Sequence, residues 1–291
     1  MQIVRKRRPA EIVLGVFLIS HPLPVVFHVI AVTVFALLAA WTRFRWDVVA
    51  LVIAAHAAMQ LSIAMLNDYC DRNLDAISKP QKPIPRGLIR PTEALMTGLL
   101  MIVMMLLLLM PLNMPALLIS LAYLVLGQAY NLGLKSTPLS GIVFALAMPL
   151  IPLYAFTGVG RTLPLLAWLV PVGALLGVAL NLANSLPDIE EDAAHGARTL
   201  AVVLGIRRTL FACPLLLVLA ALLIGVLTIT GLVPARPWIV GVAMAFTCLV
   251  GTVLVCFFRA HRPGQARKTF FYLVTVACIV LAGGWLLGAI A

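Results

Sequence analysis

The chain has 291 residues, of which 63% are hydrophobic and only 11% are charged. Soluble domains carry about 25% charged residues, so this composition excludes a water-soluble globular domain and indicates an integral membrane protein. The formal net charge of +11 is interpreted as a topology signal and an attraction to anionic lipid or substrate, and no nucleic-acid partner is expected. The five cysteines are scattered without C-x-x-C spacing, so neither a disulfide framework nor a zinc site is predicted.

Nine apolar runs, each long enough to cross a bilayer, follow one another along the chain. They span about 12–38, 48–66, 93–110, 113–132, 138–158, 163–184, 209–230, 237–258 and 269–290. The runs lack the alternation of barrel strands, so they predict helices. We therefore expect an all-α integral membrane protein, with nine transmembrane helices in a bundle around a central cavity and a single domain over 1–291. The first run follows RKRR, but its length favours a retained helix over a cleaved signal peptide.

Lys and Arg residues concentrate on one side of these nine spans. Of the 21, 17 fall in the N-terminal segment and in the loops after the second, fourth, sixth and eighth runs. Because cytoplasmic loops are enriched in Lys and Arg, the count predicts a cytoplasmic N-terminus and a C-terminus outside. We expect a multi-pass protein of the cell membrane.

Acidic residues gather in two of the predicted cytoplasmic loops, at about 67–91 and 185–208. These two segments hold seven of the ten Asp and Glu residues. The spacing N-x3-D-x3-D occurs at both places and defines a first acidic motif (Asn67, Asp71, Asp75) and a second acidic motif (Asn184, Asp188, Asp192), the second of which begins at the end of the preceding apolar run. Positions i, i+4 and i+8 share one face of a helix, so each motif is predicted to present a row of oxygen ligands at a helix end.

Each row continues into the predicted membrane region as a polar stripe. His56 and Gln60 precede the first motif on its face, and Asn181 precedes the second. Gln128 and Asn131 are candidates to join them from the fourth run. Two interpretations stay open, an acceptor pocket or hydrogen bonds between helices, the second being the usual use of such residues.

Two acidic rows that face each other would repel unless cations lay between them. Oxygen ligands without His or Cys select hard ions, and Mg²⁺ typically bridges carboxylates to substrate phosphates. Basic residues on the same side are expected to hold the remaining phosphate oxygens; they are Arg72, Lys79, Lys82, Arg86, Lys135 and Arg198. The predicted ligand is a diphosphate with Mg²⁺. The alternative is a solvated charged surface, against which the repeated spacing and the shared side argue.

These residues carry a resemblance to the UbiA superfamily of intramembrane prenyltransferases, which includes 4-hydroxybenzoate polyprenyltransferase-like enzymes. NDYCDRNLDAISKPQKPIPRG resembles the family's first motif, and NSLPDIEEDAAHGARTLAV resembles its second. YNLGLKST is a weaker match to the family's Tyr and Lys after the fourth helix. The likeness spans residues from about 20 to 210.

The resemblance implies an Mg²⁺-dependent prenyltransferase that moves an isoprenyl group from an isoprenyl diphosphate to a lipophilic or aromatic acceptor. It implies that the metal ions are held by Asn67, Asp68, Asp71, Asp75, Asp188 and Asp192. The implied catalytic residues are Asp71, Asp75, Asp188, Asp192 and Lys135. Substrate contacts are expected from Asn67, Asp68, Arg72, Lys79, Lys82, Arg86, Tyr130, Asn184 and Arg198, with His56 and Gln60 as acceptor candidates. The prolines at 80, 83 and 85 predict an extended loop that would close over the donor as a lid.

Two positions depart from the family pattern. Ser185 replaces an Asp of the second motif, which leaves that motif one ligand poorer. In SHPLP, His21 stands where the family has Arg. Either a phosphate contact is lost there, or His21 is a capped histidine with its hydrogen bonds satisfied, and we favour the second interpretation.

Two rival functions remain. One is a terpene cyclase of the same superfamily, which would ionise the donor and fold the cation onto itself. The other is a lipid or ion transporter, which would predict an acidic residue in the middle of a helix. None of the ten acidic residues lies in such a place.

Overall fold

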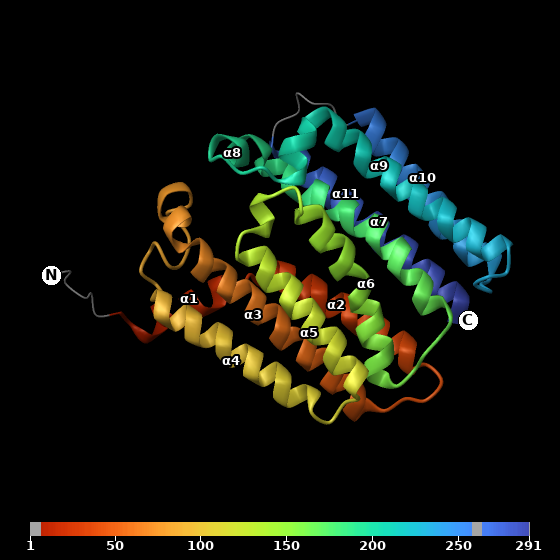
Figure 1. Ribbon diagram of the computed structural model, residues 1–291, viewed down its shortest axis with the longest axis horizontal. Coiled ribbons are helices and arrows are strands. Elements are labelled where there is room, and N and C mark those ends of the chain that lie inside the picture. The colour runs from red at the N-terminus through yellow and green to blue at the C-terminus, as the bar shows by residue number, and fades with distance from the viewer. Residues whose placement is uncertain (1–6, 258–263, 291) are drawn as a thin grey trace. The chain divides into compact units, whose positions relative to one another are not determined.

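The computed structural model describes residues 7–257 and 264–290, and every regular element in that part of the chain is a helix (Figure 1). The α-helices are α1 (Pro9–Ile19), α2 (Pro22–Ala40), α3 (Trp46–Ser78), α4 (Pro91–Leu109), α5 (Met114–Asn131), α6 (Ser140–Val159), α7 (Leu165–Ser185), α8 (Ile189–Ala194), α9 (Leu200–Ile229), α10 (Pro237–Phe257) and α11 (Gly264–Ile290). Two 3-10 turns, η1 (Leu134–Ser136) and η2 (Leu186–Asp188), lie between them.

Among the described residues, nine helical segments are long and apolar enough to cross a membrane, which confirms the predicted number of spans. The first apolar run is divided between α1 and α2. The break falls at His21, because the residue before a proline is disfavoured in the α conformation and Pro22 opens the next helix. With 11 residues, α1 is too short to span a bilayer.

The two acidic motifs differ in how far they follow the predicted local structure. The first motif lies on a helix end, as its spacing predicted, but the predicted loop boundary at about residue 67 is wrong, because α3 continues to Ser78 and carries the whole motif. The second was expected on one face of a single helix. That prediction is wrong, because α7 ends at Ser185, and Pro187 lies in the 3-10 turn η2 before α8 begins.

The predicted loop at about 185–208 is also shorter than expected. Helix α9 begins at Leu200, so Arg207 and Arg208 are helical, and Gly205, with φ of 76°, kinks the helix before them. The four basic residues Arg5, Lys6, Arg259 and Arg262, which the orientation count includes, lie outside the described residues.

The helices form two compact units. The first comprises Met1–Leu132 and Tyr154–Arg161, and the second comprises Gly133–Leu153 and Thr162–Ala291. The boundary within α6 falls just after Pro152, where the helix lacks a backbone donor. A single domain over 1–291 stays a prediction.

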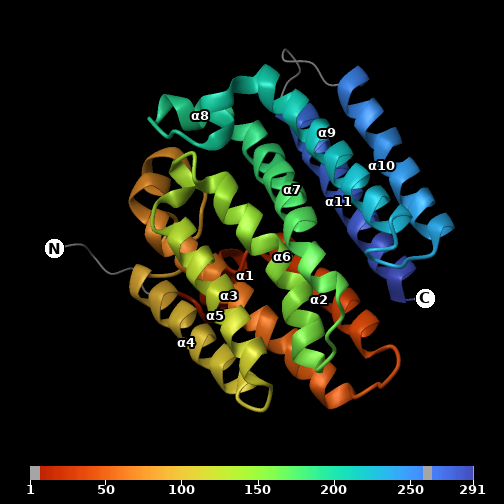
Figure 2. The same ribbon diagram turned by 45° about the vertical axis from the view of Figure 1, so that its right-hand side comes forward.

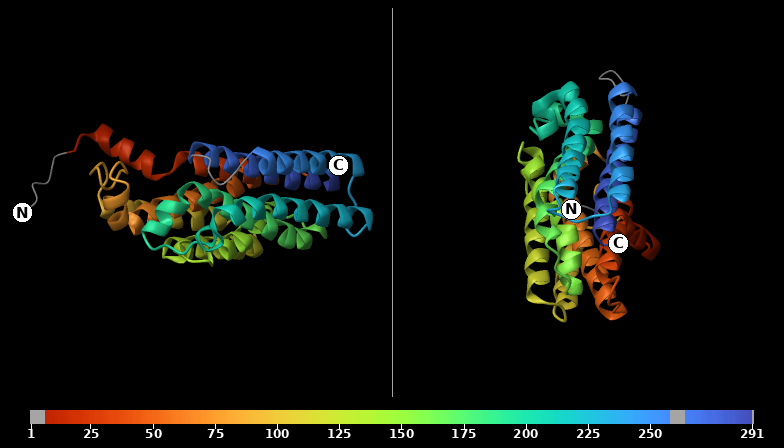
Figure 3. Two further views of the ribbon diagram at one scale, coloured as in Figure 1. Left: turned by 90° about the horizontal axis from the view of Figure 1, so that it is seen from above. Right: turned by 90° about the vertical axis from the view of Figure 1, so that its right-hand side faces the viewer.

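Helix α3 is the centre of the first unit. It packs against α2, α4 and α5, and these helices lie side by side in Figures 1 and 2. In the second unit α7 packs against α9 and α11, and α10 packs against α9 and α11 (Figure 3). Close helix contact in this unit depends on Gly177, where an added Cβ would lie 2.3 Å from the Phe144 carbonyl oxygen of α6. The last turns of α3 in the first unit, and the break after α7 in the second, are therefore held by packed helices.

Candidate active site

The last turns of α3 bury two carboxylates, that of Asp75 in the first acidic motif and that of Asp68, which follows Asn67 in the chain. Asp68 is 2% exposed and Asp75 is 4% exposed, seven residues apart on the same side of the helix. Buried carboxylates are unfavourable unless they are paired and hydrogen-bonded. The structure supplies such a partner from the segment that follows α3.

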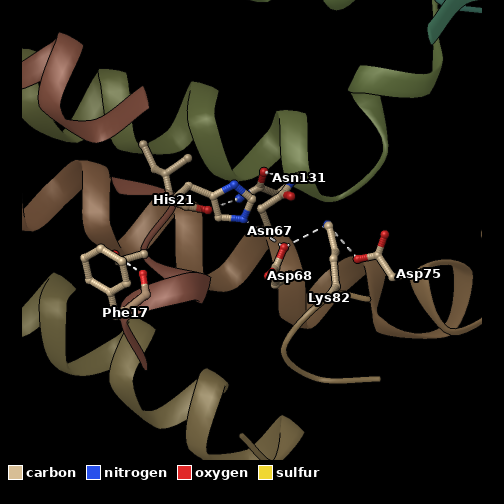
Figure 4. A network of polar contacts seen from close by, with 9 residues as sticks. Phe17, His21, Asn67, Asp68, Asp75, Lys82 and Asn131 are labelled. Carbon is tan, nitrogen blue, oxygen red and sulfur yellow. Dashed lines mark hydrogen bonds and ion pairs between the residues drawn. The ribbon is translucent and has the colours of Figure 1, made fainter. Parts of the chain in front are cut away.

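Lys82 bridges the two buried carboxylates. Its Nζ donates to Asp68 Oδ1 at 2.9 Å and to Asp75 Oδ2 at 2.7 Å (Figure 4). Burial disfavours the charged ammonium, but the hydrogen bonds to Asp75 and Asp68 outweigh it and raise the pKa of Lys82 above its ordinary value. An ammonium therefore occupies the space between two carboxylates of the predicted metal row.

Residues 79–90, here called the lid segment, join α3 to α4. The sequence predicted an extended loop, and this is wrong. The segment is non-helical but wound into turns, with backbone hydrogen bonds from Lys82 to Lys79 and from Gly87 to Ile84. Gly87 takes φ of 70°, a conformation that favours glycine, and Leu88 and Ile89 after it are buried. Arg86 is exposed, and Lys79 caps α3 through its N–H to the Asp75 carbonyl.

Other members of the first motif have partners within the same unit. Asn67 Nδ2 donates to Asn131 Oδ1 of α5 at 3.0 Å, and Asn131 Nδ2 donates to the Ile63 carbonyl at 2.9 Å. Asp71 is half-buried. Arg72, expected at a phosphate, donates to the Tyr69 carbonyl and lies with its guanidinium 4.3 Å from the Tyr69 ring centre.

His56 and Gln60 lie deeper in α3 and are nearly inaccessible, at 1% and 6% exposure. Their side chains bond to each other at 3.2 Å, and the His56 ring stacks on Tyr154 and meets Tyr123 edge-on. This arrangement favours a role in packing over an acceptor pocket, although the bond runs within one helix and not between two. The His56 Nδ1 atom has no hydrogen-bond partner.

The second acidic motif lies in the second unit and is more accessible. Asn184 and Asp188 are exposed, and Asp192 is half-buried. Glu190, from the same acidic segment, is turned to α11 and forms an ion pair with Arg267, whose Nη2 lies 2.8 Å from Glu190 Oε1. Glu190 is thus engaged in helix packing, which agrees with its absence from the predicted ligands.

Two residues of the second unit that were predicted to contact phosphate, Lys135 and Arg198, are linked through a backbone hydrogen bond. Lys135 is in η1, and the Arg198 N–H donates to the carbonyl of the neighbouring Ser136 at 2.8 Å. Asn181, which precedes the second motif, is fully buried and accepts a hydrogen bond from Ser140 at 3.3 Å, while its Nδ2 has no partner. Tyr130, the weaker match to the family's Tyr, lies half-buried in α5 of the first unit.

The donor set of both motifs fits magnesium chemically. Each motif offers amide and carboxylate oxygens without sulfur or imidazole, and Mg²⁺ is commonly held by one or two carboxylates together with water and substrate phosphates. Within the described parts of the chain, no three His, Cys, Asp or Glu side chains are grouped closely enough to hold a metal ion by themselves.

One contact to the buried Asp68 joins residues 47 positions apart. His21 Nε2 lies 2.9 Å from Asp68 Oδ1 and donates to that carboxylate (Figure 4). The sequence signalled His21 only through its departure from a family Arg, and the interpretation of a satisfied histidine agrees with this bond. That its partner is a motif aspartate was not foreseen.

The amino-acid sequence is similar to those of several known proteins. The digeranylgeranylglyceryl phosphate synthase of Pyrococcus abyssi is 33% identical over 187 residues, which cover 64% of this chain and 63% of the relative. That of Natronomonas pharaonis is 34% identical over 160 residues, covering 54% and 57%. The chain thus spans less than two thirds of the length of these curated relatives.

Solved structures share the fold at low identity. A UbiA homolog from Archaeoglobus fulgidus bound to DMAPP and Mg²⁺ superposes with a TM-score of 0.71 at 17% identity, covering 91% of this chain and 96% of the homolog. The profile of the UbiA prenyltransferase family matches residues 28–283, which include both acidic motifs. The chain therefore belongs to the UbiA prenyltransferase family.

Proposed function

We propose that this protein is a membrane prenyltransferase, which moves an isoprenyl group from an isoprenyl diphosphate to a lipophilic acceptor and releases diphosphate. The observation that carries the proposal is the buried pair Asp68 and Asp75 at the end of α3, held by a lysine of the lid segment. Ionisable side chains that gather inside an apolar membrane bundle usually mark a substrate or ion site, even where they pair with one another. Family membership and the synthase relatives support the same chemistry.

The proposed roles follow the two motifs. Asn67, Asp71 and Asp75 of the first motif and Asp188 and Asp192 of the second would hold Mg²⁺, which when bound would neutralise the charge of the departing diphosphate. Lys135 and Arg198 would donate to phosphate oxygens, and Lys79, Lys82 and Arg86 would do so from the lid segment. Closing that segment would exclude water from the site. Exclusion matters because an allylic cation is hydrolysed where water reaches it.

For the acceptor, we propose a prenylated glycerol phosphate. The support is the name of the curated relatives, which are digeranylgeranylglyceryl phosphate synthases. Aromatic acceptors are the comparison in the test below. The side of the membrane is proposed from the Lys and Arg count, which puts both motifs at the cytoplasmic face of the cell membrane.

The test is an incubation of purified protein with radiolabelled geranyl, farnesyl and geranylgeranyl diphosphate. Each donor is offered alone, with a prenylated glycerol phosphate, or with a phenolic acid, with and without Mg²⁺. We expect Mg²⁺-dependent diphosphate release together with a lipid product that contains both donor and acceptor. A cyclic hydrocarbon formed from donor alone would instead establish a cyclase, and no diphosphate release with any pair would contradict the proposal.

A further inference from the structure

His21 occupies a backbone conformation that side chains rarely adopt. It lies between α1 and α2 with φ of 45° and ψ of 62°, and among the described residues it alone combines a side chain with a positive φ. Left-handed residues other than glycine are unfavourable and persist where surrounding contacts hold them. The contact that accompanies this conformation is the hydrogen bond from His21 Nε2 to Asp68.

The bonds from His21 and Lys82 converge on one atom. Both donors lie 2.9 Å from Asp68 Oδ1, and Lys82 continues to Asp75 (Figure 4). The carboxylate is 2% exposed, so its orientation is set by these partners and not by water. A donor from the α1–α2 break thus fixes the oxygen that receives the lysine of the lid segment.

The other end of the lid segment is held by the same N-terminal region. Arg7 donates to the Leu88 carbonyl at 3.2 Å and forms a two-point ion pair with Glu93 of α4. The backbone of Leu88 lies so close to α1 that an added Cβ on Gly15 would be 3.0 Å from it. Ile19 and Ile89 share an apolar cluster with Met65. The base of the lid segment is therefore anchored to α1 and to Arg7 just before it, whereas its other end is held by the contacts of Lys82 with Asp68 and Asp75.

We propose that His21 is a positioning residue, which holds Asp68 as the receptor for Lys82 and so keeps the lid segment closed on α3. Asp68 then serves the lid, and metal ligation by the first motif falls to Asn67, Asp71 and Asp75. What the lid covers rests on the proposed function. The closure itself is tested without donor or acceptor.

The lid segment offers a sharp measurement. Trypsin does not cleave before proline, and proline follows three of the four basic residues of the segment; these are Lys79, Lys82 and Arg90. Cleavage is therefore confined to the bond between Arg86 and Gly87, both exposed. Its rate in ligand-free protein in detergent reports how often the segment opens.

Three substitutions separate the ring from the backbone. His21→Gly suits the positive φ but removes the donor, and His21→Asn tolerates that φ but is too short to reach Asp68. His21→Gln retains an amide donor at the position of Nε2. We expect about tenfold faster cleavage in the Gly and Asn variants, since a hydrogen bond to a charged group is lost, and a rate near wild type in the Gln variant. His195→Gln, in the second unit, is the matched histidine control and should not change the rate.

A double variant tests whether His21 acts through the lysine. Lys82→Met should also accelerate cleavage, and adding His21→Gly to it should accelerate cleavage no further. A wild-type rate in both His21→Gly and His21→Asn would overturn the proposal, and so would multiplicative effects in the double variant. If the His21 variants fail to fold, hydrogen exchange of the Gly87 and Leu88 amides in Asp68→Asn replaces them. Exchange at the wild-type rate there would equally overturn the proposal. None of these outcomes depends on donor or acceptor, so failure here leaves the transferase test intact.

Discussion

The first and second acidic motifs share the spacing of one Asn and two Asp residues, but their surroundings differ. In the first, Asp75 is buried beside Asp68, and both are paired with Lys82. In the second, Asn184 and Asp188 are exposed, and the helix breaks between them. The first motif is thus organised by its own unit, whereas the second presents its carboxylates on a break between helices.

This difference separates what each motif contributes. Removing a carboxylate from a buried ion pair leaves an unpaired charge, so the first motif is tied to stability. An exposed carboxylate contributes little to folding, so the second motif is expected to matter for ligand binding alone. Identical spacing in sequence therefore does not imply identical physical roles.

The largest effect is expected at the second motif, in activity alone. Asp188→Asn should lower the rate of diphosphate release by about 100-fold or more, because a proposed ligand of the metal is lost. The midpoint of thermal unfolding in detergent should stay within about 1 °C of wild type, since Asp188 is exposed. Glu190→Gln is the matched control in the same segment and should keep most of the activity. Equal losses in both variants would contradict the assignment.

Asp75→Asn should impair both properties at the first motif. We expect a comparable loss of activity, together with a loss of about 1–3 kcal/mol in the free energy of unfolding, because Lys82 loses one of its two carboxylate partners. Chemical denaturation in detergent micelles measures the second quantity. If Asp75→Asn unfolds like wild type, the contrast between the motifs fails.

Removal of Mg²⁺ should separate activity from structure. Chelation by EDTA should abolish diphosphate release, whereas the tryptic rate at the Arg86–Gly87 bond should stay unchanged in the absence of donor. The reason is that Lys82 bridges Asp68 and Asp75 through its own ion pairs. Faster cleavage on chelation alone would show that the metal holds the lid segment.

The smallest effect is expected at an exposed ion pair at the start of α3, the opposite end of the helix from the first motif. Arg45 and Asp47 pair at 2.6 Å, but their side chains are 69% and 61% exposed. Asp47→Asn should change the free energy of unfolding by less than about 0.5 kcal/mol. This variant is the reference for the loss of unfolding free energy in Asp75→Asn. A similar loss in both variants would mean that burial does not strengthen the ion pair of Asp75.

Much of the architecture could be predicted from the pattern of residues. Nine spans follow from nine long apolar runs, since a bilayer requires about 20 apolar residues per helix. The family follows from the motifs around Asn67 and Asn184, and the profile match confirms it. The predicted ends of the helices were wrong where polar residues continue a helix, as Asp71 and Asp75 do in α3. The reason is that hydropathy detects only the apolar part of a helix and not its polar extension.

The candidate site was only partly predictable for the same reason. The sequence identifies which side chains carry charge, and spacing places Asn67, Asp71 and Asp75 on one helical face. That the second row faces the first stays a prediction. Lys82 and Asp75 are only seven residues apart in the sequence. Their ion pair nevertheless depends on turns in the lid segment that the prolines alone did not specify.

The sequence by itself determined the membrane class, the number of spans and the family, and it supplied the candidate ligands of a metal and a diphosphate. The tertiary structure decided that Asp68 is buried and meets His21, and that Asn184 and Asp188 stay exposed. The reason is that hydropathy runs and motif spacing are properties of short stretches of the chain, which can be read from the sequence directly. A hydrogen bond across 47 residues depends instead on how α1, α2 and α3 pack, and no local pattern encodes that distance.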